Sequence, residues 1–356
     1  MPHELSKSAT ARLAAILPNY NHAEYLPRAL EALLAQDVPG GVDIVVVDDG
    51  STDNSLDILN RFAADHPSIK VIASPRNEGA IATLAKGLDA TEAEYVYFAA
   101  ADDWVIPGFF NEAITALKAH PKLGLYCGEA LLIDAGSGEV IGLRPAVRPR
   151  HTAGPISAGD TRQLLARSDN WILTGSAVFR RDAVLSAGGF NAELGSFADG
   201  FMTRKVALTR GFYFSPRQVS AWTVSTGSLS VRTALELGGY DQALRVAEQI
   251  ANDPAFPDWY SATFRKRFIF GSLRLSLLLA GPDERLRANL DLMSDSPVDR
   301  ALSRLVLRFP NSRLPRMVLL AWLWHRYRPY PPVELLRTQV ARWWQGTPRG
   351  IPHRAG

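Results

Sequence analysis

The sequence predicts an α/β protein with a mostly parallel sheet flanked by helices, followed by a helical C-terminal extension. Short continuous apolar runs, typical of buried parallel strands, alternate with helical apolar stripes over residues 1–130. Polar and acidic groups directly follow these runs. After about residue 231 the pattern is helical. We therefore expect a sheet domain over residues 1–230 and a basic helical extension over residues 231–356.

The first two strand–helix units are the clearest. Residues 13–17 and 44–47 are apolar runs that predict buried strands. Between them, apolar residues at helical spacing over residues 25–34 predict a helix lying on the sheet. Residues 56–63 repeat that stripe, and residues 51–53 are positioned to cap the helix they precede.

Two further units follow the same alternation. Residues 71–73 and 95–98 predict strands, and residues 80–90 and 109–117 predict helices. This order is typical of a parallel sheet. Residues 136–159, rich in Gly, Pro and Arg, are interpreted as a long loop or an excursion from the domain.

Composition narrows the class of protein. Cys127 is the single cysteine, which excludes a disulfide framework and a zinc site built from cysteines. Residues 1–13 contain no apolar run typical of a signal peptide, and no stretch approaches the ~18 apolar residues that span a bilayer. We expect a cytoplasmic location, either free or peripheral on the inner face of the membrane.

Polar and acidic groups follow each of the four predicted strands. In open parallel sheets, ligands bind beyond the carboxyl ends of the strands, so these groups are expected to meet at one edge. Alternatively, the acids cap helices or stabilise turns, and His22 is a loop residue. The groups are residues 18–22, Asp48 and Asp49, residues 76–79, and Asp102 and Asp103.

Carboxylates at a strand end can hold a hard divalent cation, whose shell is completed by water and substrate phosphates. Such a cation can neutralise a departing diphosphate. The motifs of dinucleotide dehydrogenases, P-loop enzymes and α/β-hydrolases are absent from the sequence. A nucleotide-diphosphate site that uses carboxylates and a metal is the remaining interpretation.

With these blocks the sequence resembles the family 2 glycosyltransferases of the GT-A fold. The resemblance covers about residues 11–230. It is carried by five blocks in order, of which the fifth extends through a Gly-Gly-Phe element to Asp199. The blocks are residues 17–21, 45–53, 77–79, 95–107 and 175–199.

The resemblance implies roles for individual residues. Asp102 matches the last acid of the family's Asp-x-Asp element and would bind Mn²⁺ or Mg²⁺. Asp199 matches the general base. The residues implied to bind the nucleotide-sugar, with Asp48 at its base or ribose, are Pro18, Tyr20, Asn21, Glu24, Asp48, Asp49, Asn77, Gly79 and Asp103.

The implied reaction is transfer of a sugar to an acceptor hydroxyl, on a glycan or a lipid-linked acceptor, in polysaccharide or cell-envelope glycan synthesis. A base opposite the leaving group implies inversion of configuration. Three positions depart from the family pattern: Ala100 replaces the earlier acid, Lys86 or a neighbour replaces an asparagine, and Ser225 replaces a histidine. Ala100 favours the alternative of a catalytically silent protein that binds nucleotide-sugar or glycan.

The C-terminal segment has its own character. Residues 300–356 contain eleven arginines and one acid, Glu334, although the whole chain carries a net charge of only +3. Tryptophans and tyrosines are interleaved with these arginines. This pattern suits an anionic membrane surface. Packing of the aromatic residues on the catalytic domain, or self-association, is the alternative, and nucleic acid is not expected as a partner.

Overall fold

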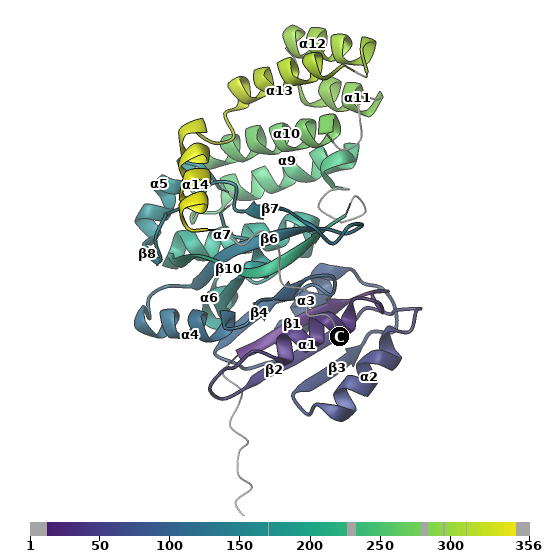
Figure 1. Ribbon diagram of the computed structural model, residues 1–356, viewed down its shortest axis with the longest axis vertical. Helices are drawn as coiled ribbons and strands as arrows, with labels where there is room; N and C mark the ends of the chain where they lie inside the picture. Colours follow the sequence, from purple (N-terminus) through teal and green to yellow (C-terminus); the bar gives the residue numbers. More distant parts are fainter. Residues whose placement is uncertain are drawn as a thin grey trace, which may run out of the picture.

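The computed structural model describes residues 13–169, 171–225, 233–278, 284–294, 296–310 and 312–346. Within these ranges the chain forms one 10-stranded mixed sheet of order β3-β2-β1-β4-β9-β6-β10-β5, with β7 paired to β6 and β8 paired to β10 (Figure 1). The strands are β1 (Leu13–Asn19), β2 (Val42–Asp48), β3 (Ile69–Ala73), β4 (Tyr95–Phe98), β5 (Trp104–Val105), β6 (Leu125–Asp134), β7 (Val140–Arg144), β8 (Gly154–Ile156), β9 (Ala177–Arg180) and β10 (Phe212–Val224).

The first half of the sheet is parallel, as predicted. Strand β1 pairs in parallel with β2 and β4, and β2 pairs in parallel with β3. The apolar runs of β1, β2 and β4 are almost entirely buried because both faces of the sheet are covered, whereas β3 lies at the sheet edge and is only partly buried. The carboxyl ends of the four strands therefore meet at one edge.

The second half of the sheet corrects one prediction. Residues 136–159 do not form a long loop, because β7 pairs antiparallel with β6 and β8 pairs antiparallel with β10. Val140 and Leu143 of β7 pack against Leu131 and Ile133 of β6, which gives this short strand its apolar contacts. Strand β9 also runs antiparallel to β4 and β6, so the whole sheet is mixed.

Helices cover both faces of the sheet. One hydrophobic cluster contains residues of α1, α2 and α4, and a second contains residues of α3 and α5–α7. The helices of the sheet region are α1 (Leu26–Leu34), α2 (Ser55–Asp65), α3 (Ala80–Asp89), α4 (Phe109–Ala119), α5 (Ala158–Arg167), α6 (Arg181–Ser186) and α7 (Ala198–Arg210), with 3₁₀ turns at Thr174–Ser176 and Ala192–Phe197.

The C-terminal region is helical throughout its described residues, as predicted (Figure 1). Helices α9 and α10 share a hydrophobic cluster with the sheet. A further cluster joins these two helices to α11, α12 and α13. The predicted boundary at residues 230 and 231 lies outside the described residues, so the division into two domains stays a prediction. The helices are α9 (Leu237–Asn252), α10 (Tyr260–Leu278), α11 (Glu284–Met293), α12 (Pro297–Arg308), α13 (Arg313–Tyr327) and α14 (Pro332–Trp344).

The aromatic residues of the basic segment fall into two groups. Trp322 donates a hydrogen bond to Asp299 at 2.7 Å, and Trp324 packs on Phe270. Trp343 and Trp344 of α14 are instead 72% and 76% exposed. In the part of the chain that the structure describes, no helix has the length and apolar content of a membrane span. Packing on the rest of the protein therefore accounts for Trp322 and Trp324 but not for Trp343 and Trp344.

Candidate functional site

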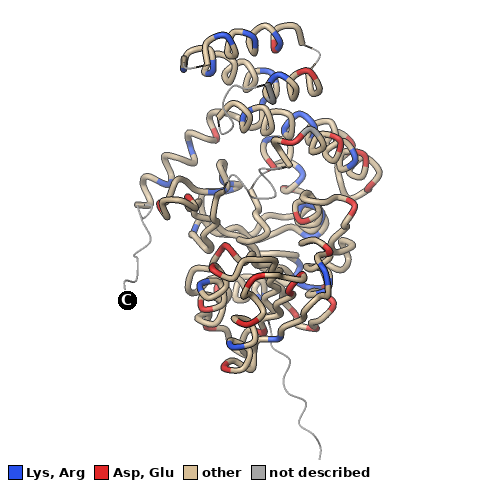
Figure 2. The backbone as a smooth tube through the Cα atoms, turned by 90° about the vertical axis from the view of Figure 1, so that its right-hand side faces the viewer, with Lys and Arg blue, Asp and Glu red and all other residues tan. Residues whose placement is uncertain are grey.

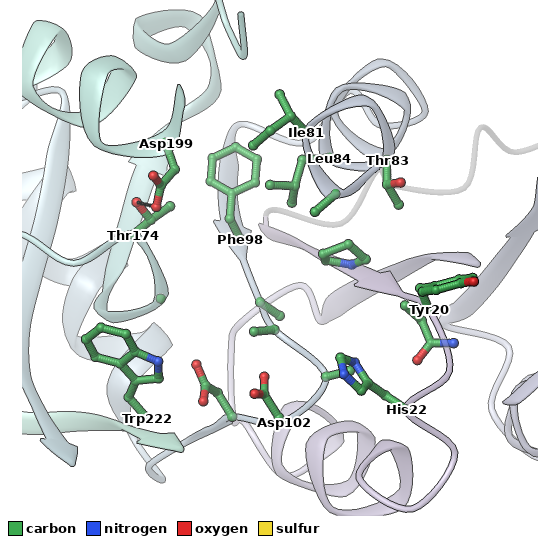
Figure 3. Close-up of a pocket in the computed structure, with 18 of the residues that line it drawn as sticks. Tyr20, His22, Ile81, Thr83, Leu84, Phe98, Asp102, Thr174, Asp199 and Trp222 are labelled. Atoms are coloured by element: carbon green, nitrogen blue, oxygen red, sulfur yellow. Dashed lines mark hydrogen bonds between the residues drawn. The ribbon is translucent and has the colours of Figure 1, made fainter. Parts of the chain in front are cut away.

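A pocket of about 640 Å³ lies at the carboxyl edge of the parallel strands. The ends of β1 and β4, the start of α3, the turn around Thr174 and the start of α7 line it. Figure 3 shows Asp199 and Thr174 on one side of the pocket, Tyr20 on the other, and Asp102 and His22 along a third side. The topology thus brings together side chains that are nearly 180 residues apart in the sequence.

Asp48 and Asn19 form a buried side-chain hydrogen bond that connects the ends of β1 and β2. The amide of Asn19 donates to the Asp48 carboxylate at 2.7 Å, and Ser51 donates to it from its backbone N–H and its hydroxyl. Asn21 accepts a hydrogen bond from the backbone N–H of Thr52. These bonds hold the loops after the first two strands in one arrangement, next to the pocket-lining Tyr20.

Asp49 fixes the third loop of the site. Its carboxylate accepts hydrogen bonds from the backbone N–H groups of Glu78 at 2.9 Å and Gly79 at 2.8 Å. Gly79 is the residue that precedes α3, so Asp49 satisfies donors at the start of that helix. Asp49 therefore binds backbone donors at the start of α3, and not at the start of α2, the helix that follows it in the chain.

Asp102 and Asp103 lie in the turn after β4. Asp103 accepts a hydrogen bond from the backbone N–H of Thr223 at 2.8 Å. Burial, together with the negative charge of Asp102, raises the pKa of Asp103 well above its ordinary value. Arg28 donates to the backbone carbonyl of Asp102 at 2.8 Å and stacks over the ring of Trp104. The turn is therefore fixed from both sides, with its acids at the pocket wall.

The donor groups at this wall fit a hard cation only in part. Among the described residues, no three His, Cys, Asp or Glu side chains gather as a metal site. Asp102 and Asp103 both line the pocket, and one oxygen of Asp103 already accepts from Thr223, so Asp102 is the carboxylate of this pair with both oxygens available. Magnesium and manganese are often held by one or two carboxylates together with water and substrate phosphates. The residues present therefore suit a metal that a diphosphate helps to hold.

Asp199 is held at the first turn of α7. One carboxylate oxygen accepts from the backbone N–H of Gly200 at 2.6 Å, and the other accepts from the hydroxyl of Thr174 at 3.1 Å. Burial raises the pKa of Asp199, although these hydrogen bonds and the positive charge of Arg204 oppose that rise. A carboxylate with a raised pKa is a stronger base than a solvated one, as general base catalysis requires.

A second cavity, of about 340 Å³, meets the first at Asp199. Both cavities are lined by Asp199, Thr174 and Ser196. The second also contains Asp169, whose carboxylate lies 3.4 Å from Arg267. Asp199 therefore stands between two spaces, an arrangement that allows one ligand on each side of its carboxylate.

The structure brings most of the predicted site residues to the pocket wall. Asn21, Glu24 and Asp48 do not line it. Asp48 is completely buried and its oxygens are used by Asn19 and Ser51. The roles assigned to these residues, like those of the residues in the pocket, stay predictions. The residues that do line it are Pro18, Tyr20, Asp49, Asn77, Gly79, Asp102, Asp103 and Asp199.

Other lining residues were not predicted from the sequence. His22, interpreted as a loop residue, lines the pocket, as do Thr174, Trp222 and Phe98. Thr174 directly precedes the Gly-Ser pair that begins the fifth block, which is a signal that could have identified it. Trp222 and Phe98 are apolar residues within strands, and such residues are indistinguishable from core residues in the sequence.

Comparison with known families places this site in context. Residues 14–183 match the sequence model described as "Glycosyl transferase family 2". The "Uncharacterized glycosyltransferase YibD" of Escherichia coli (strain K12) is 27% identical over 50% of this chain and 51% of its own length. The "Uncharacterized glycosyltransferase alr2836" of Nostoc sp. is 30% identical over 49% of this chain and 52% of its own length. The chain thus spans about half the length of these curated relatives.

Solved structures share the fold over most of the chain. S. aureus TarS 1-349 in complex with UDP-GlcNAc matches with a TM-score of 0.59 at 18% identity, over 89% of this chain and 91% of that one. The mannosyltransferase PcManGT from Pyrobaculum calidifontis, in complex with GDP-Man and Mn²⁺, matches with a TM-score of 0.54 at 20% identity, over 94% and 88%. The sheet therefore has the predicted GT-A fold, and the helical region follows it.

Proposed function

We propose that this chain, which contains a family 2 glycosyltransferase domain, transfers a sugar from a nucleotide-diphosphate donor to an acceptor hydroxyl with inversion of configuration. The observation that carries the proposal is that Asp199 and Asp102 line one pocket from different elements. The carboxyl of Asp199 has a raised pKa, and Asp102 lies beside Asp103 at the wall proposed for the cation. The proposed transfer needs one carboxylate to take the proton of the acceptor hydroxyl and another to hold a cation at the diphosphate.

The donor lies between the ends of β1 and β4 in this proposal. Tyr20, Asp49 and Asn77 are available to the nucleotide at one end, and Asp102 to the diphosphate at the other. TarS has been solved with UDP-GlcNAc and PcManGT with GDP-Man, so UDP-sugars and GDP-sugars are the first candidates. The sugar then lies toward Asp199.

Asp199 acts as the base. Its carboxylate takes the proton of the acceptor hydroxyl as that oxygen forms a bond to the anomeric carbon, and the bond from this carbon to the diphosphate oxygen breaks. Thr174 and the Gly200 N–H fix the orientation of the carboxylate. The second cavity, on the other side of Asp199, is the proposed entry for the acceptor.

A Mn²⁺ or Mg²⁺ ion held by Asp102 would supply positive charge against the departing nucleoside diphosphate. Asp103 and Arg28 hold the turn that carries Asp102, through Thr223 and through the Asp102 carbonyl. PcManGT, which shares the fold, has been solved with Mn²⁺. Because Ala100 stands where the family has a second acid, the donor phosphates would have to supply further ligands to such an ion.

We further propose that the acceptor is a glycan or a lipid-linked glycan of polysaccharide or cell-envelope synthesis, and that the protein works peripherally on the inner face of a membrane. The support is the outer face of α14. Its exposed apolar residues repeat at helical spacing, and arginines are frequent around them. The exposed residues of this stripe are Val333, Leu336, Val340, Trp343 and Trp344.

The experiment that tests the activity is a donor screen. UDP-sugars and GDP-sugars are incubated with the protein and Mn²⁺, and release of the nucleoside diphosphate is measured with and without acceptor glycans. At least one donor is expected to react, and Asp199→Asn is expected to bind that donor with unchanged affinity but to react far more slowly. Binding of a donor without turnover in the wild-type protein would instead establish a silent binding protein, the alternative that Ala100 favours.

A further inference from the structure

A third and larger cleft, distinct from the two cavities at Asp199, lies on the other side of the β6–β10 pair. It has a volume of about 1760 Å³ and shares no lining residue with the donor pocket. The hairpin of β6 and β7 forms one wall, and residues of α10 and α14 complete the other. Arg274 of α10 and Trp343 of α14, from separate helices of the C-terminal region, thus line one space.

Arginines dominate the middle of this cleft. Arg144 of β7 and Arg274 of α10 both line it, and neither side chain makes a hydrogen bond or an ion pair with another residue that the structure describes. Burial, followed by the positive charges of Arg274 and Arg342, lowers the pKa of Arg144. Arg144 and Arg274 thus place two positive charges in a partly buried site where no described acid forms an ion pair with either. Such an arrangement is unfavourable unless a bound anion offsets the charges.

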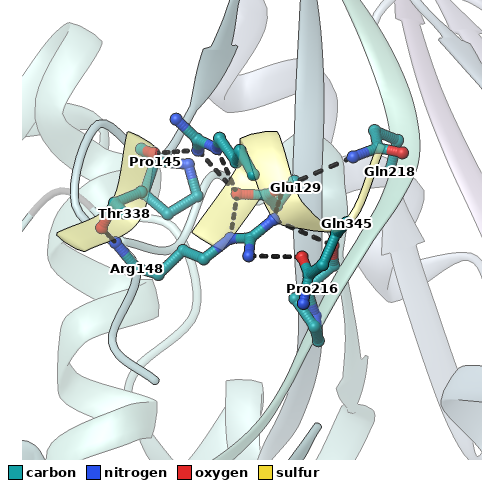
Figure 4. A network of polar contacts seen from close by, with 8 residues as sticks. Glu129, Pro145, Arg148, Pro216, Gln218, Thr338 and Gln345 are labelled. Carbon is teal, nitrogen blue, oxygen red and sulfur yellow. Dashed lines mark hydrogen bonds and ion pairs between the residues drawn. The ribbon is translucent and has the colours of Figure 1, made fainter. Parts of the chain in front are cut away.

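The neighbouring carboxylate is already used. Glu129 of β6 is completely buried and accepts hydrogen bonds from Arg148 at 2.7 and 2.8 Å and from Arg342 at 2.6 Å (Figure 4). One carboxylate therefore serves two guanidinium groups, which leaves a net positive charge here. The acids that line the cleft, Glu31 and Glu139, come from α1 and from the tip of the hairpin.

We propose that Arg144 and Arg274 form a binding site for a phosphate ester. Guanidinium groups present planar pairs of N–H donors that match phosphate oxygens, and such charge-assisted bonds are strong. Tyr330 and Gln339 also line the cleft and offer further polar groups. The site is independent of the proposed transferase activity, because it shares no residue with the donor pocket.

Helix α14 indicates where the phosphate comes from. The side of α14 that faces the protein carries the buried Thr338 and Arg342, whereas its outer side carries the apolar stripe. Trp343 connects the apolar stripe with the cleft, because its side chain is 72% exposed and also lines the cleft. An apolar face beside an arginine site suits a phospholipid, with the headgroup phosphate in the cleft and the apolar residues among the lipids. A soluble phosphate ester presents the same group without the apolar part.

The test compares Arg144→Gln/Arg274→Gln with a control of equal charge, Arg308→Gln/Arg313→Gln, whose arginines are exposed on α12 and α13. Flotation measures binding to phosphatidylcholine vesicles with and without phosphatidylglycerol, and calorimetry measures binding of glycerol 3-phosphate. We expect the cleft variant to lose about tenfold or more in affinity for its phosphate ligand, while the control keeps most of it. The cleft variant should melt at or above the wild-type temperature, because an uncompensated positive pair has been removed.

The outcomes separate the sources and the proposals. Binding to anionic vesicles that also weakens in Trp343→Ser/Trp344→Ser assigns the site to a lipid phosphate. Binding of glycerol 3-phosphate without vesicle binding assigns it to a soluble ester. If neither ligand binds, or if the cleft variant behaves like the control, the site does not exist. Asp199→Asn should bind either ligand normally, so failure of the transferase proposal would leave this result unchanged.

Discussion

At the residue scale, Asp199 shows how a fold raises the pKa of a carboxylate and still orients it. Burial raises this pKa, whereas the bonds from Gly200 and Thr174 favour the charged form and oppose the rise. The effect of burial on the pKa exceeds that of the hydrogen bonds, because the buried carboxylate has lost its hydration. The balance yields a base that is fixed in position and stronger than a solvated aspartate.

The pH profile of transfer follows from this balance. In the proposed reaction Asp199 must be ionised to accept a proton, so the rate is expected to rise with pH as the carboxyl loses its own proton. Because the pKa is raised, the rise should occur at higher pH than the ordinary value of 3.8. In Asp199→Asn we expect this limb to vanish and kcat to fall by about 10²–10⁴-fold. Asp65→Asn, an exposed acid at the end of α2, is the control and should keep the wild-type profile.

The metal requirement is expected to depend on Asp102. Removing divalent cations with EDTA should abolish transfer, and adding Mn²⁺ should restore it. In Asp102→Ala the Mn²⁺ concentration for half-maximal rate should rise by at least about tenfold, since a ligand carboxylate is lost. Unchanged Mn²⁺ dependence in this variant would remove Asp102 from the metal site. Asp65→Ala supplies the control.

At the scale of elements, the loops after β1, β2 and β3 are locked to one another. Gly50 has a φ of 74°, and a Cβ at this position would lie 2.7 Å from the backbone of Arg76. The loop that contains Asn77 and Gly79 thus packs directly on the turn after Asp49. The shape of the pocket therefore depends on a glycine that does not line it.

Replacing Gly50 should show this dependence. Gly50→Ala is expected to displace residues 76–79, to destabilise the protein by about 2–4 kcal/mol and to weaken donor binding. Gly41→Ala is the matched control, because Gly41 has a φ of 81° with no atom within 4 Å of an added Cβ. It should lose only about 1 kcal/mol from strain and keep donor affinity. Urea unfolding and donor titration measure the two effects.

At the scale of the whole molecule, the C-terminal region is attached to the sheet at both of its ends. Helices α9 and α10 share the apolar cluster of the sheet, and α14 returns to β6 through the bonds of Arg342 to Glu129. Residues more than 200 positions apart thus form one buried polar network. Figure 2 shows blue Lys and Arg positions along the helices at the end of the molecule away from the parallel strands, with a few red acidic positions among them.

Loss of Glu129 should uncouple this attachment. Glu129→Ala leaves the buried Arg148 and Arg342 without their carboxylate, which should destabilise the protein by about 3–5 kcal/mol. Limited proteolysis should then release α14 first. The exposed Glu92→Ala is the control and should change the free energy of unfolding by less than about 0.5 kcal/mol. Equal stability of the two variants would contradict a structural role for the network.

Local pattern was sufficient for the parallel half of the fold and insufficient for the rest. The apolar runs that form β1, β2 and β4 are continuous and buried, so the sequence pattern that predicts these strands is strong. Strand β7 has only five residues and pairs with the neighbouring β6, and β8 has three residues and pairs with the distant β10. Runs this short carry too little periodicity to predict a strand. The same limit applies to Thr174 and Trp222, whose place in the pocket follows from pairing between β6, β9 and β10.

The sequence by itself determined the alternation of strands and helices and the acids after each strand, because apolar periodicity and strand order place those groups at one edge of a parallel sheet. Only the tertiary structure decided how each acid is used. Asp48 holds loops without lining the pocket, Asp49 and Asp103 line the pocket while they hold a loop and β10, and Asp102 and Asp199 line it as well. The reason is physical: a carboxylate's role depends on which donors surround it, and those donors come from residues far away in the chain.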